Sequence, residues 1–290
     1  MVEVLADGFD AVAAARRVKL VCLDLDGTLL NPAKQLSAGN RAAIERARAA
    51  GLHVAIASGR HPFNICELLD GLGMPHDAVC LSGAYVMLGG REVARHGLDD
   101  ATVLRIIDVV ERYGCYVSLA GADFNLTSGN IDRGPGGATG AVSRYIDCDG
   151  FDDLRAQVGK HAGAFLKAAT HAQDEATYQA LRADLREIPG VSVAQSDTRW
   201  SDVVATGCSK AEGIEAFARA LDLSMAEVAA VGDDENDVES LGAVGLGVAM
   251  GNALPVAHAA AKISVADNAH DGVAEAIDFI LSAQAPGAQA

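Results

Sequence analysis

Apolar residues form short runs that alternate with amphipathic stretches near the N-terminal end of the chain. Val18–Leu25 is a nearly continuous apolar run that ends at Asp26-Gly27, as expected for a strand of a parallel sheet buried on both faces. A helix is predicted over 37–50, a second apolar strand over 52–58 and a second helix over 62–72. Because strands and helices alternate, we expect a parallel sheet.

The same alternation returns near the C-terminal end. The pattern predicts a helix over 211–221, a strand over 227–231, a short helix over 238–241, a strand over 246–249 and a last helix over 272–281. Two separated blocks of this kind can complete one sheet, so the predicted fold class is α/β.

The segment between the blocks, roughly Tyr85 to Val203, has a different pattern. Short alternating stretches predict strands near 115–121, 123–129, 162–170, 191–196 and 199–204, with helices near 99–113 and 173–187. This is an α+β pattern inserted into an α/β one. The glycine-rich stretch Gly129–Gly140 is its only low-complexity segment, and the single tryptophan, Trp200, is interpreted as a packing residue.

Composition and charge limit the class of protein. A chain of 290 residues, half of them hydrophobic and 21% charged, is expected to fold into about two domains. Acidic residues outnumber basic ones by 39 to 23, and no dense basic run exists, so neither nucleic acid nor a membrane is an expected partner.

The start of the chain shows no targeting segment, because Glu3, Asp7 and Asp10 interrupt the first residues. The longest uncharged stretch, Leu241–Ala261, contains too many glycines, with an asparagine and a proline, for a membrane helix. The six cysteines form no close pairs and are expected to be reduced, buried thiols. We therefore expect a cytoplasmic protein.

Two aspartates end the first predicted strand. Asp24 and Asp26 are two residues apart, so their carboxylates project to the same side of its C-terminal end, where open α/β sheets bind ligands. The alternative is that Asp26-Gly27 makes a turn and Asp24 only caps it. The residues that follow, 28–32, do not resemble a returning hairpin strand, which weakens this alternative.

Ser58-Gly59-Arg60 ends the second predicted strand. A hydroxyl, a residue without Cβ and a fixed cation together make a cradle for phosphate. Taken alone, Ser58 is equally well explained as the N-cap of the next helix, and Arg60 as a solvated surface charge.

Lys210 stands at the start of a predicted helix, between Ser209 and Glu212, which have the spacing of a capping box. A cation at that end opposes the helix dipole, and such a local mismatch is more common at functional sites. An exposed N-terminal lysine remains the alternative.

Four acids crowd into five positions of Gly232–Asp237, directly after a predicted strand. One acid at a helix N-terminus is ordinary, but four beside a strand end indicate a hard divalent cation bound by oxygen ligands. Mg²⁺ is the natural candidate.

Together these motifs resemble the haloacid dehalogenase superfamily. The chain is most similar to its Cof-type phosphatases, which carry a large α/β cap, of the type called C2, between the second and third motifs. The resemblance covers about residues 18–281 and rests on the order of four motifs, Asp24–Thr28, Ser58–Arg60, Ser209–Lys210 and Gly232–Asp237.

The resemblance implies a role for each motif residue. Asp24 would be the nucleophile that forms an aspartyl-phosphate, and Asp26 the acid that protonates the leaving oxygen and then deprotonates water, with its side chain turned away from the metal. Mg²⁺ would be held by the Asp24 carboxylate, the Asp26 backbone carbonyl and Asp233, supported by Asp237. The residues expected to bind phosphate or substrate are Thr28, Ser58, Gly59, Arg60, Lys210 and Asn236.

The chain departs from the family pattern at Ser58, where threonine is frequent, at Ala211, where glycine is frequent, and at Ser82-Gly83-Ala84, where family members often have Asn-Gly-Ala. The last departure puts an asparagine contact at the junction of core and cap in doubt. None of the three removes a group that the chemistry requires.

The sequence thus predicts a Rossmann-like parallel-sheet core (about 1–84 and 203–290) with an inserted α+β cap (about 85–202) that selects the substrate. The predicted function is a Mg²⁺-dependent phosphatase of small phosphorylated metabolites, with sugar phosphates as the first class from the resemblance alone. We expect the loop Gly129–Gly140, with Asp132 and Arg133, to contact the substrate, and the alternative is a solvated loop that contacts nothing. The alternatives are a phosphomutase, which would shield the phospho-enzyme from water, and a phospho-aspartate switch, which would need neither Asp26 nor a large cap. The sequence does not indicate an oligomeric state.

Overall fold

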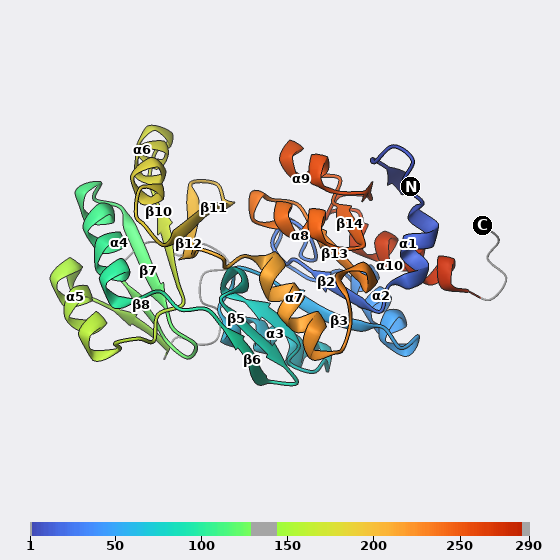
Figure 1. Cartoon of the computed structure of the whole chain (residues 1–290), viewed down its shortest axis with the longest axis horizontal. Helices are drawn as coiled ribbons and strands as arrows, with labels where there is room; N and C mark the ends of the chain where they lie inside the picture. The colour runs from blue at the N-terminus through green and yellow to red at the C-terminus, as the bar shows by residue number, and fades with distance from the viewer. Residues whose placement is uncertain (1, 129–143, 286–290) are drawn as a thin grey trace.

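Two β-sheets organise the chain, one of nine strands and one of six. The computed structural model describes residues 2–128 and 144–285, so the predicted contact loop Gly129–Gly140 lies outside the described residues. Figure 1 shows the two sheets side by side along the long axis, each with its own helices. We call the six-stranded sheet with helices α4, α5 and α6 the cap, and the nine-stranded sheet with the other helices the core.

The core sheet is mainly parallel. Its strand order is β1-β15-β14-β13-β2-β3-β4-β5-β6, and the six strands from β15 to β4 run parallel, while β1, β5 and β6 pair antiparallel at the edges. The strands are β1 (Glu3–Val4), β2 (Leu20–Leu23), β3 (His53–Ala57), β4 (Ala78–Cys80), β5 (Tyr85–Leu88), β6 (Arg91–Arg95), β13 (Val228–Gly232), β14 (Leu246–Ala249) and β15 (Ile263–Ser264).

Helices cover both faces of this sheet, as the apolar run of β2 requires. Val21 and Leu23 pack on the face covered by α1 (Ala11–Arg17), α2 (Ala38–Ala49), α3 (Pro62–Leu72) and α10 (Gly272–Gln284). Leu20 and Cys22 pack on the opposite face, under α7 (Lys210–Ala220), α8 (Val238–Ala243) and α9 (Pro255–Ala260). The α/β fold class and the elements predicted for both flanking blocks are confirmed to within a few residues.

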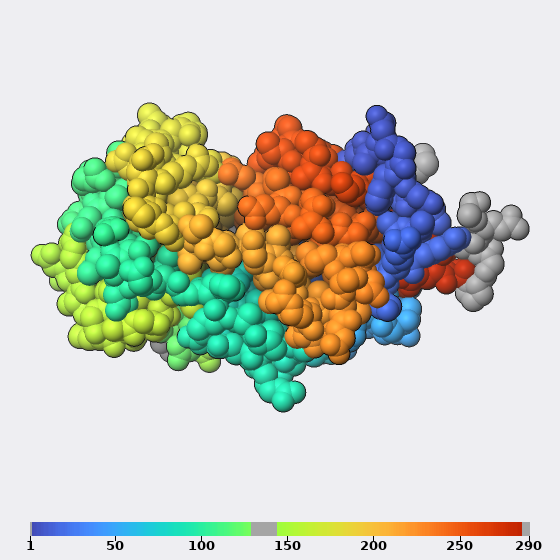
Figure 2. Space-filling view, in the orientation of Figure 1, coloured from blue at the N-terminus to red at the C-terminus, as the bar shows by residue number. Residues whose placement is uncertain are grey.

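The cap has one covered face. Its strand order is β11-β12-β10-β7-β8-β9, and α4 (Asp100–Arg112), α5 (Gly150–Lys160) and α6 (Glu175–Arg186) pack on the alternate residues that point to one side, among them Val117, Ala168 and Val203. The strands are β7 (Tyr116–Ala120), β8 (Asn125–Thr127), β9 (Tyr145–Asp147), β10 (Lys167–His171), β11 (Val191–Asp197) and β12 (Trp200–Ala205). Figure 2 shows the cap and the core packed against each other.

The structure moves both predicted limits of the insertion. We placed its start at Tyr85, but β5 and β6 form a hairpin around Gly89 and Gly90 that pairs with β4 and extends the core sheet. We placed its end at residue 202, but β12 stays in the cap sheet to Ala205. Strand β9 and helix α5 of the cap were not predicted, nor were β4, β5, β6, β15 and α9 of the core. None of the helices in the described part of the chain combines the length and apolarity that crossing a bilayer requires.

Candidate active site

The predicted site residues gather where two neighbouring strands end. Strands β2 and β13 pair in parallel, and Asp24 and Asp233 are the first polar residues beyond their carboxyl ends. The backbone N–H of Asp24 donates to the carbonyl of Val231 at 3.0 Å, which continues the ladder to the site. Parallel pairing therefore brings together two acids that lie far apart in the sequence.

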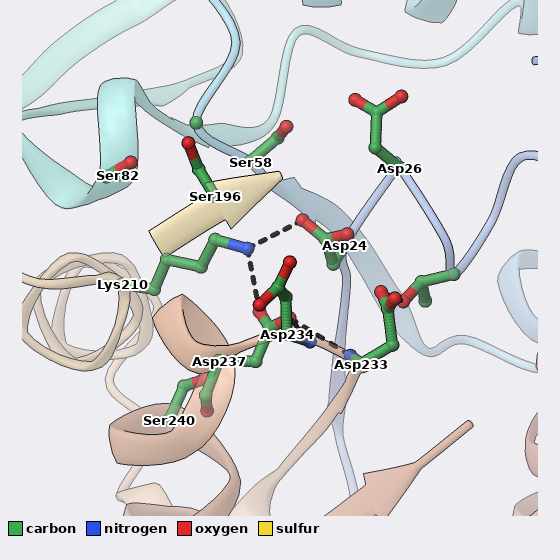
Figure 3. A network of polar contacts seen from close by, with 12 residues as sticks. Asp24, Asp26, Ser58, Ser82, Ser196, Lys210, Asp233, Asp234, Asp237 and Ser240 are labelled. Atoms are coloured by element: carbon green, nitrogen blue, oxygen red, sulfur yellow. Dashed lines mark hydrogen bonds and ion pairs between the residues drawn. The ribbon is translucent and has the colours of Figure 1, made fainter. Parts of the chain in front are cut away.

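A buried lysine joins two of the carboxylates (Figure 3). Lys210 Nζ donates to Asp24 Oδ1 at 2.6 Å and to Asp237 Oδ1 at 2.7 Å, and the whole lysine is 2% exposed. It is the first residue of α7, whose N-cap is Ser209 as the capping box predicted. Burial alone would lower the pKa of Lys210, but the charges of Asp237 and Asp24 raise it well above its usual value. Lys210 is thus a permanent cation inside the core, and not the exposed lysine of the alternative.

Three carboxylates share this space. Oxygens of Asp24, Asp233 and Asp237 all lie within 4.8 Å of one another. Burial raises the pKa of Asp24, and the charges of Asp237 and Asp233 add to this, although Lys210 opposes them. Burial and the charges of Asp237 and Asp234 also raise the pKa of Asp233 to about 7, against the Thr28 hydrogen bond and Lys210. Crowded carboxylates resist ionisation unless a further cation lies among them. A hard divalent metal ion, which binds oxygen ligands, suits this site.

The residues around the cluster hold its carboxylates in position. Asp237 Oδ2 accepts hydrogen bonds from the backbone N–H groups of Asp233 at 3.0 Å and Asp234 at 3.2 Å. Thr28, which we expected to bind phosphate, donates to Asp233 Oδ1 at 2.7 Å. Gly27 has φ of +86°, and a Cβ there would lie 2.1 Å from Asp233 Oδ2, so this approach requires glycine.

Asp26 lies outside the carboxylate cluster. Its side chain points away from Asp24 and Asp233 in Figure 3, as the resemblance implied. Arg60 donates two hydrogen bonds to the Asp26 carboxylate, from Nε and from Nη2, both at 2.7 Å. Lys34 Nζ donates a third at 2.7 Å. Burial would raise the pKa of Asp26, but the hydrogen bonds and charges of Arg60 and Lys34 lower it to about 2. In this structure Arg60, which we expected at the phosphate, holds Asp26 as a carboxylate.

A cavity of about 260 Å³ lies between the core and the cap and reaches this site. Its lining includes six of the predicted residues, Asp24, Asp26, Ser58, Gly59, Arg60 and Asn236. The other four predicted residues lie behind this surface. Lys210 contacts Asp24 and Asp237 directly, Asp233 and Asp237 share the carboxylate cluster with Asp24, and Thr28 contacts Asp233. Within the described part of the chain, the buried Oδ1 of Asn236 has no hydrogen-bond partner, so the amide retains a free acceptor next to the cavity.

Two charged residues of the cap were missed by the sequence analysis. Lys167 Nζ lies 2.5 Å from Asp202 Oδ2 and donates to the carbonyl of Gly59 at 2.7 Å, and both side chains line the cavity. Burial lowers the pKa of Lys167, and the charge of Asp202 only partly offsets this. Ser82, at the position of the Asn-Gly-Ala departure, donates to Asp202. Lys167 directly follows Phe165-Leu166 and Asp202 directly precedes Val203-Val204, and a charge beside such apolar pairs was the available indication of this cap–core contact.

The chain is similar to known proteins in sequence and in fold. A family described as haloacid dehalogenase-like hydrolase matches residues 21–277. The pyridoxal phosphate phosphatase YbhA of Escherichia coli is 28% identical over 89% of this chain and 97% of its own length. The 5-amino-6-(5-phospho-D-ribitylamino)uracil phosphatase YcsE of Bacillus subtilis is 27% identical over 90% and 94%. A haloacid dehalogenase-like hydrolase structure from B. subtilis, 24% identical, superposes with a TM-score of 0.79 over 90% of this chain and 99% of its own.

Proposed function

The chain belongs to the haloacid dehalogenase-like hydrolases and is a phosphatase of small phosphorylated compounds, and we propose that it is Mg²⁺-dependent and works through a phosphorylated Asp24. The observation that carries this proposal is the placement of Asp24: a buried carboxylate at a strand end, paired with Lys210 and open to a cavity. A carboxylate attacks a dianionic phosphate only where neighbouring cations reduce the repulsion between them.

The carboxylate cluster fits the metal part of the proposal. Asp24 and Asp233, with Asp237 and the backbone carbonyl of Asp26, would hold Mg²⁺. When bound, the ion would offset negative charge on the phosphoryl oxygens and on the attacking carboxylate. The pKa values of Asp24 and Asp233 are raised because Lys210 does not offset all the negative charge of the cluster. This supports a site that is completed by a bound cation.

The protein's own groups account for the rest of the reaction. An Asp24 oxygen forms a bond to phosphorus as the bond to the leaving oxygen breaks, and Asp26 gives that oxygen a proton. A water molecule then attacks phosphorus, Asp26 takes its proton, and the bond to Asp24 breaks with release of phosphate. Ser58, the backbone of Gly59, Lys210 and Asn236 would hold the phosphoryl oxygens. Because Asp26 is ionised beside Arg60, its acid role requires that it leave Arg60 and take up a proton.

We further propose that the cap selects the substrate. The core residues of the cavity are occupied with the phosphate and the metal, so discrimination between metabolites falls to Lys167, Asp202 and the other cap residues that line it. Sugar phosphates remain the class that the resemblance implies.

Replacement of Asp24 by Asn tests the proposal, because the amide keeps the shape of the side chain but cannot form the phospho-enzyme. We expect a folded variant with less than about a hundredth of the wild-type rate of phosphate release from p-nitrophenyl phosphate. A single-turnover reaction of the wild type with a ³²P-labelled ester should leave label on the protein that hydroxylamine removes. Asp7→Asn, at an exposed position, is the matched control. An active, correctly folded Asp24→Asn protein would overturn the proposal.

A further inference from the structure

The cap sheet presents a row of three aromatic side chains on its uncovered face. The register of β12, β10 and β7 places Trp200 opposite His171, and His171 opposite Tyr116. Because side chains alternate along a strand, these residues share the face of Asp202 and Lys167, which contact the core.

Two of these rings support the third. The rings of His171 and Trp200 are 4.8 Å apart and tilted by 36°, and Tyr116 meets the indole edge-on at 5.7 Å. The indole is partly exposed and lines the same cavity as Asp24. Trp200 therefore packs against two other rings, as we predicted, and it also forms part of the cavity wall.

Side chains shorter than the three rings lie next to the aromatic row, on the side nearer the core. The next level across the same three strands is Asp202, Ala169 and Ser118. Ala169 also lines the cavity, and its methyl group leaves open the space between Trp200 and the buried Lys167. A group bonded to the phosphate can thus enter between the indole and the core.

Two charged groups of this wall, Asp202 and Lys167, are already partnered. Asp202 accepts hydrogen bonds from Lys167, Ser82 and Ser196, and Lys167 also donates to the carbonyl of Gly59. A polyhydroxylated leaving group would find the polar atoms of Lys167 and Asp202 already in use beside Trp200, and an unsatisfied polar group is costly to bury. A flat ring requires only a flat apolar surface, which the indole provides.

From this arrangement we infer that the preferred substrate is not the sugar phosphate that the resemblance implies but a phosphate monoester whose leaving group carries a planar aromatic ring, and that this ring stacks on Trp200. The inference rests on the proposed phosphatase function and names its substrate class. The cavity also contains the carboxylates of Asp197 and Asp234, so the leaving group carries no second anionic group.

Two esters of the same ring size separate stacking from size. In both benzyl phosphate and cyclohexylmethyl phosphate, one methylene group joins a six-membered ring to the phosphate oxygen, but only the benzyl ring is flat. We expect kcat/KM of the wild type to favour benzyl phosphate by about tenfold over cyclohexylmethyl phosphate and glucose 6-phosphate, which is of the order of one stacking contact. Trp200→Leu should abolish this preference and Trp200→Phe should retain part of it.

The single tryptophan of the chain also gives a readout that does not depend on turnover. With the Asp24→Asn protein and Mg²⁺, benzyl phosphate should change the indole fluorescence at lower concentration than cyclohexylmethyl phosphate does. Equal kcat/KM for the two ring esters, or a preference that survives in Trp200→Leu, would overturn the stacking inference while leaving the phosphatase intact. Absence of phosphate release from every ester by the wild type would instead contradict the proposed function.

Discussion

Lys210 Nζ lies 2.6 Å from Asp24 Oδ1, although the two residues are 186 positions apart in the sequence. The same ammonium reaches Asp237, so one buried cation offsets two buried carboxylates. A buried ion pair is not by itself a large gain in stability, but removal of one partner leaves an uncompensated charge. The pair therefore links the stability of the core to the charge of the proposed nucleophile.

We predict that Lys210→Met lowers both stability and activity. The two carboxylates lose their cation, so the free energy of unfolding should fall by about 3 kcal/mol or more. Turnover should fall by about 100-fold or more, since a donor aimed at the phosphoryl group is lost as well. Urea unfolding and phosphate release measure the two effects. Lys160→Met, at an exposed position on α5, should change neither, and a stable, active Lys210→Met protein would contradict the prediction.

The environment of Asp26 predicts a dependence on the leaving group. Asp26→Asn cannot protonate the departing oxygen, and an alkoxide needs that proton far more than a nitrophenolate does. We expect a loss of about 100-fold or more with benzyl phosphate and less than about tenfold with p-nitrophenyl phosphate. Because Arg60 and Lys34 lose their charged partner, the stability of the variant should be measured in parallel. Equal losses with both esters would argue against the acid role.

The crowded carboxylates predict an effect of metal removal. EDTA should stop phosphate release, and added Mg²⁺ should restore it. Asp233→Asn keeps an oxygen that can accept from Thr28 but removes one negative charge. The variant should need about tenfold more Mg²⁺ for half-maximal rate, and without metal it should melt no earlier than the wild type, because less repulsion remains.

Thermal melting with and without Mg²⁺ checks this directly. The ion should raise the melting temperature of the wild type, since it binds only the folded site, and should raise that of Asp233→Asn much less at the same concentration. Full activity of the wild type in metal-free buffer would contradict the metal site.

The site could be predicted from the sequence wherever local pattern determines position. The apolar run of β2 places Asp24 at a strand end, and the Ser209–Glu212 spacing places Lys210 at the start of α7. The alternation of strands and helices predicts a parallel sheet, but the pairing of β13 with β2, which brings Asp24 and Asp233 together, is known from the structure and was implied beforehand only by the resemblance.

Contacts that depend on how the cap meets the core could not be predicted in this way. Asp202 and Ser82 are 120 positions apart, and no periodicity indicates which element covers the free face of β12. The pairing of Arg60 with Asp26 was also missed. An arginine directly after Ser58-Gly59 could bind phosphate or pair with Asp26, and the sequence is the same in both cases. No strands were predicted over residues 85–95, and the cap was placed to begin at residue 85, so the β5–β6 hairpin that extends the core sheet was missed.

The last prediction concerns His61, which follows the Ser58–Arg60 motif as the N-cap of α3. It is 4% exposed, its ring stacks on Phe63 at 3.7 Å, and its Nε2 lies 3.0 Å from the carbonyl of Phe124 in the cap. Burial is the main reason that its pKa falls from 6.5 to about 4, with the charges of Arg144 and Lys167 contributing, while the Phe124 carbonyl opposes the shift.

This lowered pKa fixes the direction of a pH effect on stability. Above pH 6.5 the imidazole of His61 is neutral in the folded and in the unfolded protein, so its titration takes nothing from the free energy of unfolding. Between pH 6.5 and 4 the unfolded chain binds a proton that the folded protein does not, and stability falls by up to about 3 kcal/mol. His61→Gln can still donate to the Phe124 carbonyl but does not titrate. Between pH 7 and pH 5 the wild type should therefore lose about 2 kcal/mol more than His61→Gln in urea unfolding. His53→Gln, at an exposed position, should follow the wild type, and parallel curves for His61→Gln and the wild type would show that His61 is not held neutral by burial.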